Sequence, residues 1–281
     1  MKKTTDIAWL PALKSKMEVL GKWLKGKGAV VIAFSGGVDS TFLAAVAQET
    51  LGDRVLAVTA TSPTYPKREL QEAVELARRI GIRHKIVQST EMENTAYREN
   101  SPDRCYHCKS ELFGLLIRMA AEEKSAVVID GSNADDATDF RPGRKALKEL
   151  GIASPLMDLG FSKTDIREAS RLMGLPTADK PAYACLASRI PYGAPITEKV
   201  LRSVEEAENA LRDLGFEQVR VRVHGDVARI ELVEGDIGRA MSWEMRRKIS
   251  DAVKAAGFRY VALDLQGYRT GSLNEALTKK P

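Results

Sequence analysis

The sequence predicts an α/β protein with a doubly wound parallel sheet, followed by a small C-terminal α+β domain. Through about residue 190, short apolar runs alternate with amphipathic segments, the pattern of a parallel sheet covered by helices. After residue 190 the pattern changes to a helix, two alternating strands, a second helix and a last strand. We therefore expect one domain over residues 1–190 and a second over residues 191–281.

The first domain opens with an amphipathic helix over residues 5–26, where apolar residues recur at helical spacing. Residues 29–34 form a continuous apolar run, which predicts a strand buried on both faces. A glycine turn at 35–40 then leads into a helix that reaches about residue 51. Further strands are predicted at 54–59, 84–88 and 126–130, and further helices at 66–80, 108–123 and 162–173.

The last of these helices has clear end signals. Ser162 and Asp165 have the spacing of a capping box, and Gly174 with Pro176 closes the helix. In the second domain we expect helices at 197–214 and 237–256. Strands at 218–224 and 227–233 alternate like a hairpin around Gly225 and Asp226, and a last strand covers 259–264.

Composition excludes several classes of protein. The chain has 281 residues, a net charge of +5 and 44% hydrophobic residues, which is ordinary for a globular protein rather than a disordered or collagen-like one. Its apolar runs are far shorter than the about 20 residues that a bilayer span needs. Three cysteines are too few for a disulfide scaffold, so we expect a cytoplasmic protein.

The glycine turn at 35–40 is the strongest functional signal. Gly36 and Gly37 let the backbone approach a ligand closely, and N–H groups at a helix N-terminus favour an anion. Ser35 and Ser40 add hydroxyl donors. Asp39 is an unexpected charge at an anion site, and we expect it to act in catalysis by holding Mg²⁺ against phosphates. The alternative is a plain strand-to-helix turn with an N-cap.

A second set of polar residues follows the fourth predicted strand, on the side where a parallel sheet binds its ligand. Asn133 and Asp135 are candidates for contacts with ATP or Mg²⁺, although Asn and Asp are common in any loop. Asp136 and Asp139 belong to the same candidate set, and Arg141 closes the loop as a candidate phosphate ligand.

The three cysteines form a third candidate site. Cys105 and Cys108 make a C-x-x-C pair, which suits a metal, a redox disulfide or an iron–sulfur cluster. Without a second such pair, a four-cysteine zinc site is disfavoured. Together with Cys185, three thiolates would leave one iron of a [4Fe–4S] cluster open to a ligand such as hydrosulfide. The alternative is that these are small apolar residues in a core.

The S-G-G-x-D-S pattern at 35–40 resembles the PP-loop of the ATP pyrophosphatase superfamily, whose fold is of the adenine nucleotide alpha hydrolase-like type. This resemblance implies cleavage of ATP between the α and β phosphates, adenylylation of an acceptor, release of pyrophosphate and attack by a nucleophile. NAD synthetases, GMP synthetases, argininosuccinate synthetases and tRNA thiolases share the loop. It therefore indicates the chemistry of activation but not the substrate.

Four segments, in the same order along nearly the whole chain, resemble the LarE family of sulfur transferases: 35–40, 103–109, 131–136 and 185–193. The resemblance implies adenylylation of a carboxylate of pyridinium biscarboxylic acid mononucleotide and its conversion to a thiocarboxylate. This happens twice for each nickel-pincer nucleotide, the cofactor of lactate racemase.

Cysteine number divides that family. Some members have one cysteine, matching Cys185, and sacrifice its sulfur to leave dehydroalanine. Others have three, matching Cys105, Cys108 and Cys185, and bind a [4Fe–4S] cluster that takes up sulfide. The sequence matches the three-cysteine form, so the resemblance implies a cluster on these residues and a catalytic role for Cys185 without its sacrifice.

The resemblance also implies that Arg220 and Arg222 lie near the substrate phosphate, and Arg189 is a further candidate. The residues alone favour a solvated strand face for Arg220 and Arg222. The expected partner is a small nucleotide substrate, with no nucleic acid and no membrane. A homo-oligomer, by resemblance a hexamer, is expected, with transient contacts to other proteins of nickel-pincer synthesis.

Two other functions remain open. A tRNA 2-thiolation enzyme also pairs a PP-loop with cysteines, but it should need a basic surface or an RNA-binding module, and neither is evident. A non-catalytic protein that senses ATP could use the same loop without turnover. Glutamine-dependent amidation is disfavoured because the sequence shows no glutaminase segment.

Overall fold

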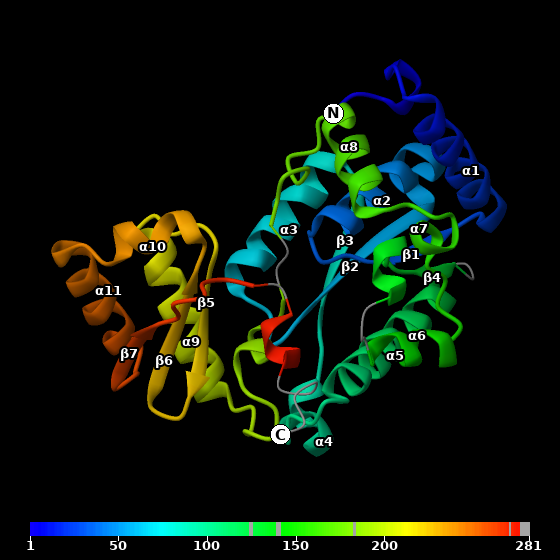
Figure 1. Ribbon diagram of the computed structural model, residues 1–281. Helices are drawn as coiled ribbons and strands as arrows, with labels where there is room; N and C mark the ends of the chain where they lie inside the picture. The colour runs from blue at the N-terminus through cyan, green and yellow to red at the C-terminus, as the bar shows by residue number, and fades with distance from the viewer. Residues whose placement is uncertain (124–125, 139–141, 182–183, 270, 276–281) are drawn as a thin grey trace. The chain divides into compact units, whose positions relative to one another are not determined.

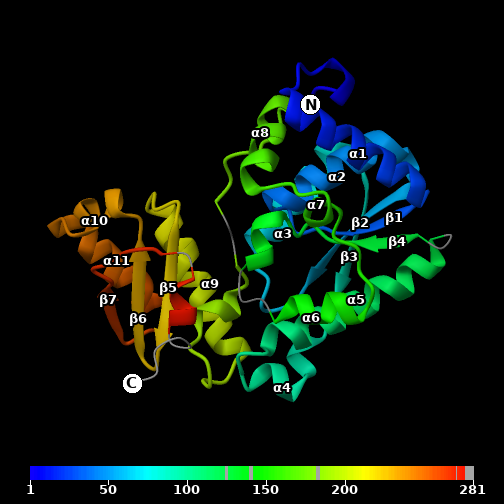
Figure 2. The ribbon, with the colours of Figure 1, turned by 45° about the vertical axis from the view of Figure 1, so that its right-hand side comes forward.

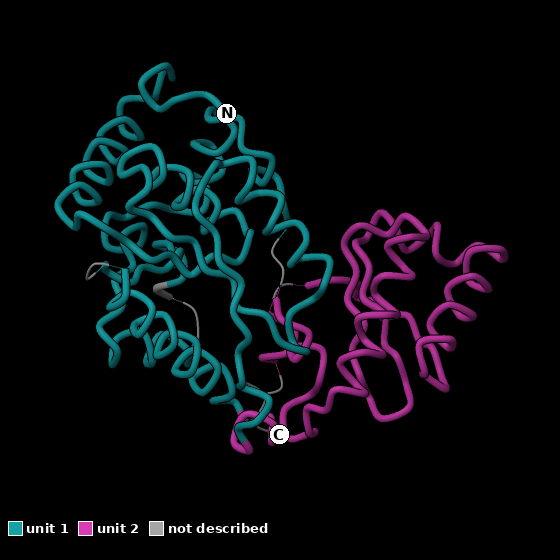
Figure 3. The backbone as a smooth tube through the Cα atoms, turned by 180° about the vertical axis from the view of Figure 1, so that it is seen from behind, with its two compact units in different colours: residues 1–94, 102–183 teal, residues 95–101, 184–281 magenta. Residues whose placement is uncertain are grey.

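The computed structural model describes residues 1–123, 126–138, 142–181, 184–269 and 271–275. Within it the chain forms two compact units, which Figure 3 distinguishes by colour. Unit 1 comprises residues 1–94 and 102–183, and unit 2 comprises residues 95–101 and 184–281. Residues 95–101 and 184–190, expected in the N-terminal domain, therefore group with the C-terminal residues.

Unit 1 is built on a four-stranded sheet in the order β3-β2-β1-β4, with every pair parallel. Its strands are β1 (Val30–Ala33), β2 (Val55–Thr61), β3 (Arg83–Gln88) and β4 (Val127–Ile129). In the register, Val30 of the central strand lies opposite Val55 on one side and Val127 on the other. This arrangement confirms the predicted parallel sheet.

Helices cover both faces of this sheet (Figures 1 and 2). Val30 and Ile32 of β1 pack in a core with α1 (Pro11–Lys27), α2 (Val38–Leu51), α3 (Lys67–Ile80) and α8 (Lys163–Met173). Val31, which points the other way because side chains alternate along a strand, packs in a second core. That core includes α5 (Arg104–Glu122) and α6 (Gly143–Glu149), whereas the short α7 (Pro155–Asp158) belongs to the first. The sheet is thus doubly wound, as predicted.

The observed helix ends agree with the sequence at α8 and differ from it at α1 and α5. The capping box of α8 is confirmed: Ser162 Oγ accepts from Asp165 N at 3.1 Å, and Asp165 Oδ2 accepts from Ser162 N at 2.9 Å. The first helix begins at Pro11 rather than at residue 5, because Pro fits the first turn of a helix. Helix α5 begins at Arg104, four residues before the predicted start.

Unit 2 contains a three-stranded sheet in the order β5-β6-β7. Strands β5 (Val219–His224) and β6 (Val227–Leu232) are antiparallel, as predicted, and β7 (Tyr260–Leu263) is parallel to β6. The helices are α4 (Thr95–Arg98), α9 (Glu198–Asp213), α10 (Glu234–Ala240) and α11 (Trp243–Ala255). A single helix over 237–256 is therefore wrong: Ser242 interrupts it and caps α11 by accepting from Met245 N at 3.4 Å.

Across the parts of the chain that the structure describes, none of the helices combines the length and apolar character needed to cross a bilayer.

Candidate active site

The glycine turn lies where β1 ends and α2 begins, at the carboxyl edge of the parallel sheet. Gly36 adopts a φ of +66°, which other residues rarely adopt. A Cβ at this position would lie 3.1 Å from both Cα and Cβ of Ala73 on α3. Glycine is therefore strongly favoured here, because any other residue would be strained by the backbone angle and crowded against α3.

Hydroxyl groups of Ser35 and Ser40 join the two ends of the loop. Ser40 Oγ accepts from Ser35 N at 3.3 Å, donates to Gly37 O at 3.2 Å, and lies 3.2 Å from Ser35 Oγ. Tyr65 OH donates to Ser35 O at 2.8 Å. Burial, helped by nearby Glu69, raises the pKa of Tyr65 well above its usual range, so this donor keeps its proton.

Asp39, in the first turn of α2, is paired with a lysine that sequence reasoning did not single out. Lys163 Nζ lies 2.5 Å from Asp39 Oδ2. Burial raises the pKa of Asp39, while Lys163 and the nearby amide of Asn133 oppose this rise. Asp39 Oδ1 is buried and has no hydrogen bond of good geometry with the described residues. An inward carboxylate oxygen with unused acceptor capacity fits the chemistry of a Mg²⁺ ligand.

Residues after β4 complete this constellation. Lys163 N donates to Asp135 Oδ2 at 2.8 Å, and Asp135 N donates to Asn133 Oδ1 at 2.9 Å. Asn133 is buried, and its N–H donates to Asp136 Oδ2 at 3.0 Å. The structure therefore brings together the start of α2, the segment after β4 and the start of α8. Asp139 and Arg141 lie outside the described residues.

Lys163 carried only an indirect signal in the sequence. It is the first residue of α8, directly after the Ser162 N-cap, so the capping box fixes its backbone at the helix start. A residue so placed can project toward a ligand at the carboxyl edge of the sheet. Lys163 meets its partner Asp39 on α2 only through tertiary packing, and the spacing of residues along the chain does not reveal such a contact.

The three cysteines fall in different units. Cys105 and Cys108 lie in the first turns of α5, not in a turn before a helix, and their three-residue spacing puts them on one helix face. Cys185 precedes the 3₁₀ turn Leu186–Arg189 in unit 2. None of the three is in a disulfide, and Cys105 and Cys185 are exposed. Within either unit, the described His, Cys, Asp and Glu side chains include no group of three gathered for a metal.

Unit 2 brings the candidate arginines into a buried network with carboxylates. Arg189 makes a two-pronged ion pair with Glu208, at 2.8 and 2.9 Å, and both side chains are 1% exposed. Burial alone would raise the pKa of Glu208, but the charge and hydrogen bonds of Arg189 outweigh it and lower the pKa. Arg222 pairs in the same way with Glu231, at 3.0 and 2.9 Å.

Arg220 has a different environment. It is 3% exposed, its Nη1 donates to Val219 O at 2.9 Å, and its guanidinium lies 5.3 Å from the centre of the Tyr268 ring. Burial, aided by the charge of Arg189, lowers the pKa of Arg220 to about 10, which leaves it protonated at neutral pH. A guanidinium group can bind a phosphate through two parallel hydrogen bonds. Substrate binding by Arg189, Arg220 and Arg222 stays a prediction.

Similarity to known proteins agrees with this geometry. The NAD synthase family model matches residues 13–138. An uncharacterized protein of Synechocystis sp. is 46% identical over 267 residues, which are 95% of this chain and 100% of that protein. An NH(3)-dependent NAD(+) synthetase of Finegoldia magna is 29% identical over 170 residues, 57% of this chain and 68% of the relative.

A further relative is similar over nearly its whole length. The pyridinium-3,5-bisthiocarboxylic acid mononucleotide synthase of Lactiplantibacillus plantarum is 39% identical over 271 residues, which cover 96% of this chain and 98% of that enzyme. Both chains thus align almost from end to end, including both units. The PP-loop, the fold and this full-length similarity together show that the chain belongs to the LarE family, the family of that synthase.

Proposed function

We propose that the chain is an ATP-dependent sulfur transferase that converts carboxylates of pyridinium-3,5-biscarboxylic acid mononucleotide to thiocarboxylates. The observation that supports this most strongly is the similarity to the named synthase over 96% of the chain. The PP-loop, in which Asp39 is paired with Lys163, supplies the chemistry that such a reaction needs first. The product belongs to nickel-pincer nucleotide synthesis, for lactate racemase.

The first step activates a carboxylate. N–H groups of the loop at 35–40 hold the phosphates of ATP, and Asp39 supplies an oxygen to Mg²⁺. A carboxylate oxygen of the substrate attacks the α phosphorus, the bond between that phosphorus and the bridging oxygen breaks, and pyrophosphate leaves. Lys163 is then able to turn from Asp39 to the charge that develops on the phosphates.

The second step replaces oxygen by sulfur. A sulfur nucleophile attacks the acyl carbon, and AMP leaves with the electrons of its bond to that carbon. Cys105 and Cys108, on one face of α5, are suitable ligands for an iron–sulfur cluster, with Cys185 as the third. We propose that these residues hold a [4Fe–4S] cluster, which when bound supplies sulfide in place of the sulfur of Cys185.

We propose that the reaction takes place in the cytoplasm, as the sequence analysis predicts. Thiols outside disulfides fit a reducing cytoplasm. Arg189, Arg220 and Arg222 are proposed to hold the phosphate of the mononucleotide, which is the proposed small-molecule partner besides ATP. We propose a homo-oligomer, a hexamer by family resemblance, and transient contacts with other proteins of the pathway, without nucleic acid or membrane.

The test is pyrophosphate release from ATP and Mg²⁺ with and without the pyridinium substrate, with product mass followed in parallel. Substrate should trigger pyrophosphate release, and the product should gain the mass difference between sulfur and oxygen. Asp39→Asn should lower the rate at least about 100-fold, as the loss of a group that stabilises charge does in other enzymes. Asp53→Asn, at an exposed aspartate of unit 1, is the matched control and should leave the rate unchanged.

Other outcomes identify the alternatives. Sulfur transfer to tRNA, with a tRNA gel shift, would indicate 2-thiolation instead. ATP binding without pyrophosphate release under any of these conditions would indicate an ATP-sensing protein.

A further inference from the structure

Two carbonyl groups of the PP-loop are held by side chains from elsewhere in unit 1. Tyr65 OH donates to Ser35 O at 2.8 Å, and Lys180 Nζ donates to Gly36 O at 3.2 Å. Tyr65 lies between β2 and α3, and Lys180 follows α8, so both donors are far from the loop in the sequence but belong to the same unit. Consecutive carbonyl groups of the loop are therefore fixed from two directions.

A hydrogen bond to a carbonyl group also sets the direction of an N–H group. In a planar trans peptide, the C=O of one residue and the N–H of the next point in opposite directions. Tyr65 therefore turns the Gly36 N–H away from itself, and Lys180 does the same to the Gly37 N–H. Among the described residues, none accepts a hydrogen bond from Gly36 N, and Gly37 N lies 3.4 Å from Ser35 Oγ, which is long for a hydrogen bond. Both N–H groups can thus donate to an anion.

These two peptide groups need fixing because Gly36 lies between them. Glycine rotates more freely about its backbone bonds than other residues do, and Gly36 has a φ of +66°. A rotated peptide group would turn a carbonyl oxygen, with its partial negative charge, toward a bound phosphate. The glycine that fits against α3 therefore requires hydrogen bonds from outside the loop to keep its neighbouring N–H groups in place.

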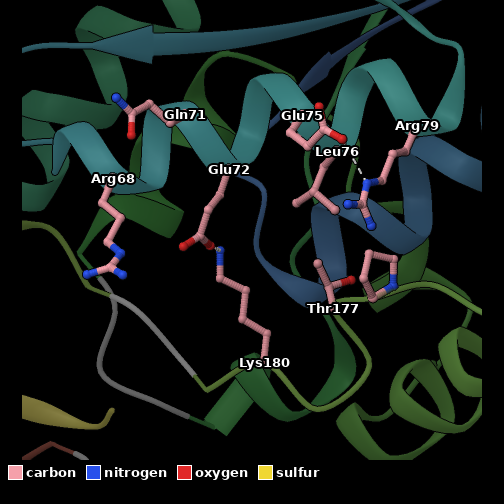
Figure 4. A pocket seen from close by; sticks show the side chains of 9 residues that line it. Arg68, Gln71, Glu72, Glu75, Leu76, Arg79, Thr177 and Lys180 are labelled. Carbon is pink, nitrogen blue, oxygen red and sulfur yellow. Dashed lines mark hydrogen bonds and ion pairs between the residues drawn. The ribbon is translucent and has the colours of Figure 1, made fainter. Parts of the chain in front are cut away.

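Lys180 is a charged donor in a place of low exposure. Its Nζ lies 2.8 Å from Glu69 Oε2 and from Glu72 Oε2, and Figure 4 shows the side chain reaching toward Glu72 on α3 beside a cavity of about 580 Å³. The side chains of Lys180 and Glu69 are 11% and 10% exposed. Burial lowers the pKa of Lys180, but the hydrogen bonds and charges of the two glutamates outweigh it and raise the pKa. The ammonium group stays charged at neutral pH, which strengthens its bond to Gly36 O.

Tyr65 is held where its hydroxyl group reaches the loop. Its backbone N donates to Ser62 O at 3.1 Å. The hydroxyl groups of Ser62 and Thr64 both donate to the buried carboxylate of Glu91, which follows β3. The turn that carries Tyr65 is consequently tied to the next segment along the sheet. Because burial raises the pKa of Tyr65, its hydroxyl group remains a donor at neutral pH.

We propose that Tyr65 and Lys180 are positioning residues for ATP, which hold the carbonyl groups of Ser35 and Gly36 so that the N–H groups of the PP-loop face the phosphates. The inference rests on the proposed function, in which this loop binds ATP, and adds two residues that act through the loop. Their effect depends on the phosphates, since it involves neither adenine nor ribose. Losing either bond should therefore weaken the binding of ATP and spare that of adenosine.

The test measures the dissociation constants of ATP with Mg²⁺ and of adenosine by calorimetry, in the parent, Tyr65→Phe and Lys180→Met. The Kd for ATP should rise about fivefold in Tyr65→Phe, the usual effect of one hydrogen bond. It should rise at least about 10-fold in Lys180→Met, because the lost donor is charged. The Kd for adenosine should change by less than about twofold in both variants, because one hydrogen bond outside its contacts is lost.

Two control variants separate the loop bonds from other effects of the same substitutions. Tyr106→Phe removes a hydroxyl group that donates to Glu149 Oε2 at 2.7 Å rather than to the loop. Glu72→Gln removes the charge of a partner that is 45% exposed and keeps the bond from Lys180 to Gly36 O. Both controls should bind ATP within about twofold of the parent, since exposed pairs contribute little.

Amide resonances give a second readout. The Gly36 and Gly37 N–H signals should shift on addition of ATP to the parent, and shift less in Tyr65→Phe and Lys180→Met. Unchanged ATP affinity in both variants would overturn the proposal, and so would an equal loss of ATP and adenosine binding. A parent that does not bind ATP would contradict both this proposal and the proposed function. A parent that binds ATP but forms no thiocarboxylate would contradict the proposed function alone.

Discussion

The Asp165 carboxylate fixes the start of α8, the helix whose first residue belongs to the candidate site. Its Oδ2 accepts hydrogen bonds from Ser162 N at 2.9 Å, Ser162 Oγ at 2.8 Å and Lys16 Nζ at 2.7 Å. Burial would raise the pKa of Asp165, but the bonds from Lys16 and Ser162 outweigh it and lower the pKa. The residue that follows the cap is Lys163, the partner of Asp39. A cap at this point therefore stabilises the helix and places a residue of the site.

A prediction follows for stability and pH. Asp165→Asn should lower the free energy of unfolding by about 1 kcal/mol at pH 7, the usual loss at a helix cap. Because the folded pKa lies below the unfolded value of 3.8, the charge stabilises the fold above pH 3.8 and stops doing so as the pH falls through the folded pKa. Urea unfolding followed by helical circular dichroism should therefore show parent and variant converging below pH 3.8.

An exposed aspartate supplies the control. Asp179 follows α8 in the chain and pairs with Arg171 of that helix, but the Asp179 side chain is 77% exposed. Asp179→Asn should leave the free energy of unfolding almost unchanged, because exposed ion pairs contribute little to stability. An equal loss in both variants at pH 7 would contradict the special role of the cap.

At the residue scale, the sequence predicted those site residues that lie close together along the chain. Ser35, Gly36 and Asp39 follow a recognisable strand and precede a helix, so their chemistry could be predicted. Lys163 and Lys180 could not, because they reach Asp39 and Gly36 only through the packing of α8 and its following segment. Contacts between residues more than a hundred positions apart leave no periodic signal in one sequence.

At the scale of elements, the end of β4 lies directly against the start of α2. A Cβ at Gly131 would lie 3.0 Å from Ser40 N and 3.2 Å from Ser40 Cα, both backbone atoms. Such contacts cannot be relieved by turning a side chain. The glycine therefore sets how closely the strand and the PP-loop helix approach one another.

Gly131→Ala should raise the KM for ATP about 10-fold, since the methyl group displaces the N–H groups that would hold phosphates. Pyrophosphate release at varied ATP concentrations measures this effect. Gly21→Ala is the control: it lies inside α1 with open space around it, so the KM should not change and stability should rise by about 1 kcal/mol. A normal KM in Gly131→Ala would show that the loop adapts to the added methyl group.

Most elements were predicted, because strands buried on both faces and capped helices leave strong patterns. The predicted helix ends are wrong where a capping residue or a proline interrupts a stretch that keeps helical spacing. Residues 237–256 continue in helical spacing across Ser242, yet the Ser242 side chain offers its oxygen to Met245 N and starts a new helix. Likewise Pro11 sets the start of α1, although the apolar spacing extends further back.

At the scale of the molecule, the three proposed cluster ligands come from both units: Cys105 and Cys108 from unit 1, and Cys185 from unit 2. Anaerobic reconstitution should yield about four irons per chain, as expected for a cysteine-ligated [4Fe–4S] cluster. Cys105→Ala should lose most of this iron, measured by metal analysis and by the brown absorption. Ser110→Ala, on the same helix α5, should keep it. Full iron binding by Cys105→Ala would refute the cluster, and loss of one sulfur from Cys185 after turnover would indicate sacrifice instead.

Asn100 shows how the chain is divided between its units. It is fully buried, and its Nδ2 donates to Pro191 O at 2.8 Å and to Ala194 O at 2.9 Å, so residues 95–101 are held within unit 2. The chain thus enters unit 2, returns to unit 1 and enters unit 2 again. No single cut separates the two units, and a fragment ending at residue 190 would lose the Pro191 and Ala194 carbonyls that accept hydrogen bonds from the buried Asn100 amide. Cutting the chain at one position is therefore expected to destabilise unit 2, which needs residues 95–101 as well as the C-terminal residues.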